Sequence, residues 1–137
     1  MSGSCHHIAT ALILWAVVIC GTVDVGAHHS FFAVYDRMQP FTVTGTVTKV
    51  EWTNPHIHFS LEVMRGNGSV TTWIFSGAAA ATLTRQGMSE MTIKVGDVIK
   101  VDGFRALDGS FTAAAGAVTL PNRKRIFVGP LEELTPI

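Results

Sequence analysis

The chain has 137 residues, which allows one compact domain with one hydrophobic core and excludes a large multidomain protein. Ten basic and ten acidic residues give a formal charge of zero, so the sequence lacks the polybasic surface that is typical of nucleic-acid-binding proteins. Both cysteines, Cys5 and Cys20, lie near the start of the chain. The rest of the sequence therefore offers no thiol for a disulfide, a metal or a nucleophile.

Residues 1–27 predict a cleavable signal peptide. The uncharged apolar run over residues 8–20 is about thirteen residues long, which suits a signal core and is short of the roughly 20 residues that span a bilayer. Residues 25–27 supply the small and aliphatic side chains that signal peptidase prefers, so we expect cleavage after Ala27, with cleavage one residue earlier as the alternative. The mature protein is then exported and keeps no membrane span.

The next part of the chain predicts two β-strands joined by a turn. The stretch from Phe41 to Trp52 alternates with period two: threonines form one face, and the other face carries Val43, Gly45, Val47 and Lys49. Thr53-Asn54-Pro55 then turns the chain. A second strand from His56 to Met64 places His56 and His58 on the face opposite its apolar residues.

The order of the remaining predicted strands and of the predicted helix indicates the fold class. They are expected as a strand over residues 69–75, an alanine-rich helix over 77–87 that stops at Gly87, strands over 97–105 and 111–120, and a short edge strand over 126–128. Residues 129–137 are expected to lie loose. The predicted fold is mostly β: a small five-stranded OB-like barrel with one short helix between strands 3 and 4, forming a single domain over residues 28–137.

Three segments resemble a family of small exported bacterial proteins whose function is unassigned. They are Ala27-His28-His29-Ser30-Phe31 with Tyr35-Asp36, the run Gly-Thr-Val-Thr-Lys-Val-Glu-Trp-Thr-Asn-Pro-His over residues 45–56, and residues 115–121 after an Asp108-Gly109 turn. The resemblance covers nearly all of residues 27–128. It implies an OB-like domain exported to a Gram-negative periplasm, and it brings no activity with it.

Histidines at the new N-terminus favour a copper site. Cleavage after Ala27 would give His28 both a free amine and an imidazole, which can chelate one copper ion, with a third nitrogen supplied by another histidine. Cleavage after Gly26 would instead make His29 the third residue of the mature chain. The terminal amine, the backbone amides and the His29 imidazole then suit a square-planar Cu(II) site. His56 follows the rigid Asn-Pro turn, where the first inter-strand loop of an OB barrel opens onto its usual ligand face.

Each of these residues also has a simpler interpretation. Terminal histidines can merely be solvated, and the His56 ring can hydrogen-bond a loop carbonyl and order the turn. Glu51 can hydrogen-bond a ligating imidazole and orient it, or it can be a solvated carboxylate. Trp52 can cover a Cu(I) ion, or it can pack in the core. His58 shares the strand face of His56 and is expected to be structural or exposed.

The sequence thus predicts a non-enzymatic periplasmic protein that binds metal, with copper as the cofactor and His28, His29 and His56 as ligands. No familiar catalytic motif is present, although a copper-dependent oxidative enzyme is a minor alternative. The main alternative is an OB-type module of the cell envelope that binds a small ligand or a partner protein without a metal. Its contact face would use Trp52, Asn54, His56 and Trp73. A purely structural envelope protein is the third interpretation.

Overall fold

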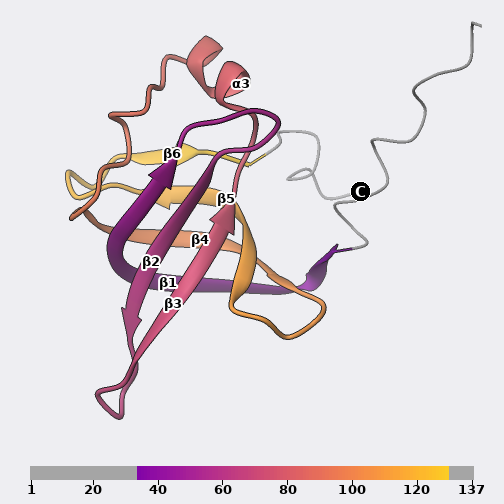
Figure 1. Ribbon diagram of the computed structural model, residues 1–137, viewed down its shortest axis with the longest axis vertical. Helices are drawn as coiled ribbons and strands as arrows, with labels where there is room; N and C mark the ends of the chain where they lie inside the picture. Colours follow the sequence, from indigo (N-terminus) through magenta and orange to yellow (C-terminus); the bar gives the residue numbers. More distant parts are fainter. Residues whose placement is uncertain (1–33, 130–137) are drawn as a thin grey trace, which may run out of the picture. The chain divides into compact units, whose positions relative to one another are not determined.

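The computed structural model describes residues 34–129, which form six strands and one helix (Figure 1). The elements are β1 (Tyr35–Glu51), β2 (His58–Met64), β3 (Val70–Ser76), α3 (Ala80–Arg85), β4 (Val98–Ala106), β5 (Thr112–Thr119) and β6 (Arg125–Phe127). The helix of this part of the chain is too short to cross a membrane.

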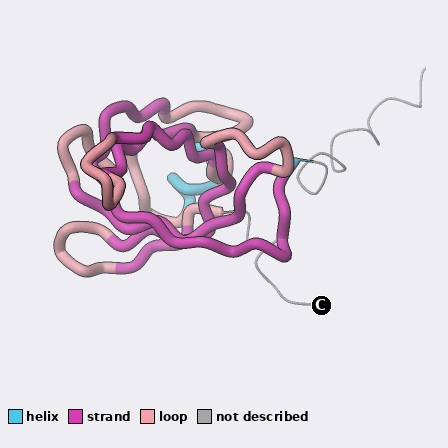
Figure 2. The backbone as a smooth tube through the Cα atoms, turned by 90° about the horizontal axis from the view of Figure 1, so that it is seen from below, coloured by secondary structure: helices cyan, strands magenta, loops and turns pink. Residues whose placement is uncertain are grey.

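Five of the strands close into a ring. The sheet order is β3-β2-β1-β4-β5-β6, and an additional parallel pairing joins β3 to β5, from Ile74 opposite Thr112 to Ser76 opposite Ala114. Figure 2 shows the strands as a ring. This closure, with a helix between the third and fourth strands, is the arrangement of the OB barrel. The predicted fold class is confirmed, and β6 adds the predicted short edge strand beside β5.

The long first strand contains a β-bulge that the alternation did not reveal. Gly45 and Val47 face the interior as predicted, but the register with β2 shifts between Val47 and Lys49, so one extra residue sits in β1. The shift reverses the faces, since Val50 packs against the core and Lys49 is exposed. The prediction that Lys49 shares the face of Val47 is therefore wrong. β1 also begins at Tyr35, earlier than the predicted start at Phe41.

The helix is shorter than its alanine-rich sequence predicts. Gly77 and Ala78 are drawn into backbone hydrogen bonds with Ile57 and Val128, so the helix starts only at Ala80. Tertiary pairing thus overrides the helix propensity of alanine. At the other end the prediction holds: Gly87 has a φ of 83° and stops the helix.

Aromatic and aliphatic side chains from the strands and from α3 fill the barrel. The rings of Phe59 and Phe75 stack with centroids 5.3 Å apart, and Trp73 lies 4.8 Å from Phe41. Leu83 reaches the same cluster from α3. The largest fully buried side chains are Phe59, Phe75, Ile57, Leu61, Leu83, Ile93, Ile99, Val47, Val101, Val118 and Val128.

The close approach of β4 and β5 requires glycine at position 103. A Cβ atom there would collide with the carbonyl oxygen of Ala114, which is backbone and cannot swing aside. We predict that Gly103→Ala lowers the free energy of unfolding by about 1–3 kcal/mol or more, as overpacking usually does. Urea unfolding would measure the change. Gly66→Ala is the matched control, because nothing lies within 4 Å of its Cβ position; equal stability of the two variants would contradict the argument.

Candidate functional site

The loop between β1 and β2 is docked onto the chain that leads into α3. The Ile57 N–H donates to the carbonyl of Ala78 at 3.0 Å, and the Gly77 N–H donates back to the carbonyl of Ile57 at 2.9 Å. Gly77 allows this approach, because a Cβ atom there would lie 2.9 Å from both the Ile57 side chain and the Val128 carbonyl oxygen. The pairing fixes where the loop sits.

The same loop caps the N-terminus of α3. The first N–H groups of a helix have no partner within it. Here the Ala80 N–H donates to the carbonyl of Thr53 at 3.1 Å, and the Ala81 N–H donates to Asn54 Oδ1 at 3.1 Å. The side chain of Ala79, at the N-cap position, makes no such bond. Two residues of the Trp-Thr-Asn-Pro-His run therefore serve as the remote cap of the helix.

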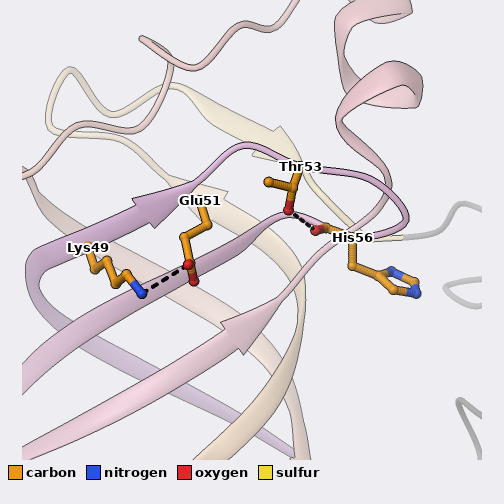
Figure 3. A network of polar contacts seen from close by, with 4 residues as sticks. All are labelled: Lys49, Glu51, Thr53 and His56. Atoms are coloured by element: carbon orange, nitrogen blue, oxygen red, sulfur yellow. Dashed lines mark hydrogen bonds and ion pairs between the residues drawn. The ribbon is translucent and has the colours of Figure 1, made fainter.

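His56 is held by this docked loop at two points. Its carbonyl accepts a hydrogen bond of 2.9 Å from Thr53 Oγ1 (Figure 3), and its Nδ1 lies 2.9 Å from the carbonyl oxygen of Gly77. A carbonyl oxygen can only accept, so Nδ1 carries the proton and donates. In the neutral ring the lone pair then lies on Nε2, which has no hydrogen-bond partner among the described residues. The residue is exposed.

Glu51 and His58 are not joined to the His56 ring by any contact within residues 34–129. Glu51 forms an exposed ion pair with Lys49, with 2.9 Å between Nζ and Oε1, and Figure 3 shows the His56 ring pointing away from this pair. His58 is half-buried in β2, in register with Glu51 on one side and Ser76 on the other. The simpler interpretation of His56, a ring that hydrogen-bonds a loop carbonyl, thus agrees with the structure, and the acceptor is the carbonyl of Gly77.

The other residues proposed for a ligand face have structural contacts. Trp73 is 6% exposed and belongs to the core, and Trp52 is partly buried against the same core. The Asn54 side chain is engaged with α3. Of the five neighbouring residues predicted from sequence, Glu51 and Asn54 are exposed, and Glu51 is paired with Lys49 rather than with α3.

The remaining predicted ligands, His28 and His29, lie outside the described residues. Within residues 34–129, no group of three or more His, Cys, Asp and Glu side chains gathers closely enough to hold a metal ion. The described part of the chain therefore contributes the single histidine His56 to the predicted copper site, without its partners.

Residues 16–115 match a family described as a family of unknown function, DUF6152. The chain belongs to this family. The resemblance seen in the sequence is confirmed, and the DUF6152 match carries no activity with it. No curated protein matches the chain.

Among solved structures, a protein of low sequence identity to this DUF6152 chain has a similar backbone. It is the mitochondrial single-stranded DNA-binding protein Rim1 of S. cerevisiae, with 8% sequence identity and a TM-score of 0.46, over 61% of this chain and 93% of that one. The OB-like architecture of the present chain is read from its own strand order and ring closure.

The capping role of Asn54 can be measured. We predict that Asn54→Ala lowers the free energy of unfolding by about 1 kcal/mol, the usual cost of losing a helix cap, because the Ala81 N–H loses its acceptor. Asn54→Asp keeps an acceptor beside the helix N-terminus and should stay close to the wild type. Thermal unfolding of the three proteins tests this, and an Asn54→Ala protein as stable as the wild type would show that the cap is dispensable.

Proposed function

We propose that this protein is an exported, non-enzymatic copper-binding protein of the periplasm that buffers or delivers the metal. In this proposal His56 is the ligand fixed by the fold, and His28 and His29 supply the other nitrogen ligands from the N-terminus of the mature chain. Imidazole and amine nitrogens suit Cu(II), which has the highest affinity among the divalent first-row metals.

The proposal is supported above all by the hydrogen bonding of the His56 ring. Metal-binding histidines commonly donate their second ring N–H to a carboxylate or backbone carbonyl, which sets the tautomer and the orientation. The Nδ1 contact to the Gly77 carbonyl supplies this arrangement and leaves an exposed Nε2 with its lone pair. A hydrogen bond to a loop carbonyl and metal binding therefore use different nitrogens of the same ring.

The surroundings of His56 favour a metal over a ligand-binding face built from its neighbours. The alternative module would use Asn54 beside His56, but the Asn54 amide caps α3. The carbonyl of Gly77 takes the orienting role first considered for Glu51, whose carboxylate is paired with Lys49. The metal proposal thus needs only the exposed imidazole and the terminal histidines.

A Cu(II) titration followed by electron paramagnetic resonance tests the proposal. The protein should be purified after export, with its N-terminus verified by intact mass. We predict one-to-one binding with a nitrogen-rich signal, and affinity at least about tenfold weaker in His56→Ala because a ligand is lost. His58→Ala is the matched control and should bind like the wild type, since His58 lies half-buried in β2. A signal and affinity indifferent to His56→Ala would remove His56 from the site.

The role of the terminal amine is tested by extending the chain. One extra residue before the verified N-terminus displaces the amine from the histidines, so we predict that tight Cu(II) binding is lost while the unfolding temperature of the metal-free protein is unchanged. Isothermal titration calorimetry on both forms measures this. An extended protein that keeps the full affinity would refute the terminal part of the site, whatever the result for His56.

A further inference from the structure

A second feature with its own chemistry lies at the mouth of the barrel. Along β4 the buried positions alternate through Ile99, Val101 and Gly103, and the alternation then breaks, because Arg105 is exposed and Ala106 is buried. The β4–β5 loop that begins just after it lies at the end of the barrel away from α3 (Figure 1). An exposed arginine therefore lies near the end of β4 that leads into this loop.

The guanidinium of Arg105 is fixed by two aromatic rings. Its central carbon lies 5.0 Å from the centroid of Phe41 and 5.2 Å from the centroid of Trp73, which are cation–π distances. Trp73 is itself packed in the core, so the platform is rigid. Among the described residues the guanidinium has no carboxylate and no hydrogen-bond acceptor as partner. Its five N–H donors are available at the surface.

Arg105 borders a small pocket of about 220 Å³. The walls come from the start of β1, the middle of β3, the end of β4 and the β4–β5 loop: Asp36, Gln39, Trp73, Arg105, Ala106, Leu107, Gly109, Ser110 and Phe111. The rings of Trp73 and Phe111 meet edge to face at 5.3 Å. The pocket thus joins one cation to an aromatic wall, and its volume limits the ligand to a small molecule.

The other polar side chains of this pocket already have partners. The carboxylate of Asp36 accepts hydrogen bonds from the Met38 N–H at 2.8 Å and from Gln39 Nε2 at 3.0 Å. The hydroxyl of Ser110 lies 2.7 Å from that of Thr112. The guanidinium of Arg105 has no such partner among the described residues, so it is the group of this pocket that can bind an anion, while the Asp36 carboxylate beside it is already held by its two donors.

We propose that this pocket binds a small organic carboxylate, with Arg105 holding the carboxylate and the apolar part of the ligand lying against Trp73 and Phe111. A planar guanidinium binds a carboxylate through two parallel hydrogen bonds, and stacking on aromatic rings orients the guanidinium before the ligand arrives. The site is independent of His56 and of copper, because it shares no residue with the loop that holds that histidine.

The probe is sodium phenylacetate, titrated at constant ionic strength into the exported protein. The indole N–H resonance of Trp73, identified with a Trp52→Phe variant, should shift and saturate, while that of Trp52 stays in place. Phenylacetamide, which has the same shape without the charge, should bind at least about tenfold more weakly. Absence of a saturable shift at Trp73, or equal binding of the two compounds, would overturn the proposal.

Variants separate Arg105 from a general effect of surface charge. Arg105→Met keeps an apolar stem on the aromatic platform and should weaken phenylacetate binding at least about tenfold, and Arg105→Lys, which keeps the charge without the planar fork, should also weaken it. Arg125→Met is the matched control: Arg125 also stacks on an aromatic ring, 5.6 Å from the centroid of Phe127, and neither residue lines the pocket. Circular dichroism checks that each variant is folded. Equal loss in Arg125→Met and Arg105→Met would refute a specific role of Arg105.

Discussion

The two backbone hydrogen bonds between Ile57 and the Gly77–Ala78 segment are the contact on which the rest of this structure depends. They bring the β1–β2 loop against the start of α3, where Thr53 and Asn54 serve as its cap. They also place the Gly77 carbonyl where it meets the His56 ring, and the neighbouring Ala78 N–H reaches Val128 beyond β6 at 2.7 Å. Loop, helix, histidine and the end of the last strand are thus joined through one small segment, whose closeness depends on glycine at position 77.

Local patterns in the sequence predict the strands well, and they fail where a distant segment decides the conformation. The alternation of threonine with apolar residues predicts β1 as far as Val47, because the threonines are exposed while the other face passes from half-buried Phe41 and Val43 to buried Gly45 and Val47. The extra residue before Lys49 reverses the faces and has no local signature. Ala78 is a good helix former that instead completes a pairing with chain far away in sequence. The parallel pairing of β3 with β5, which closes the barrel, was implied only by the order of the elements.

The two candidate sites also differ in how far the sequence predicts them. His56 was recognised because it follows a rigid turn, and a loop carbonyl was one expected partner of its ring, but no sequence pattern indicates that this carbonyl belongs to Gly77. Arg105 was overlooked because an arginine at the end of a strand resembles an ordinary surface residue, and its contacts with the rings of Phe41 and Trp73 have no local signature. The two groups have complementary chemistry. A neutral ring nitrogen with a lone pair accepts a cation, whereas a guanidinium with free N–H groups accepts an anion, and the fold places His56 in the β1–β2 loop and Arg105 in β4.

The closed ring also constrains the order in which the molecule can form. β1 borders both β2 and β4, and β3 finds its second neighbour only in β5, near the end of the folded chain. Until β4 and β5 are available, the sheet of β1, β2 and β3 has two unpaired edges, and such edges readily pair with other chains. Contacts between residues distant in sequence also slow folding. The edges of the first three strands therefore stay unpaired until β4 and β5 have formed. The nascent chain is most exposed to misassembly during that interval.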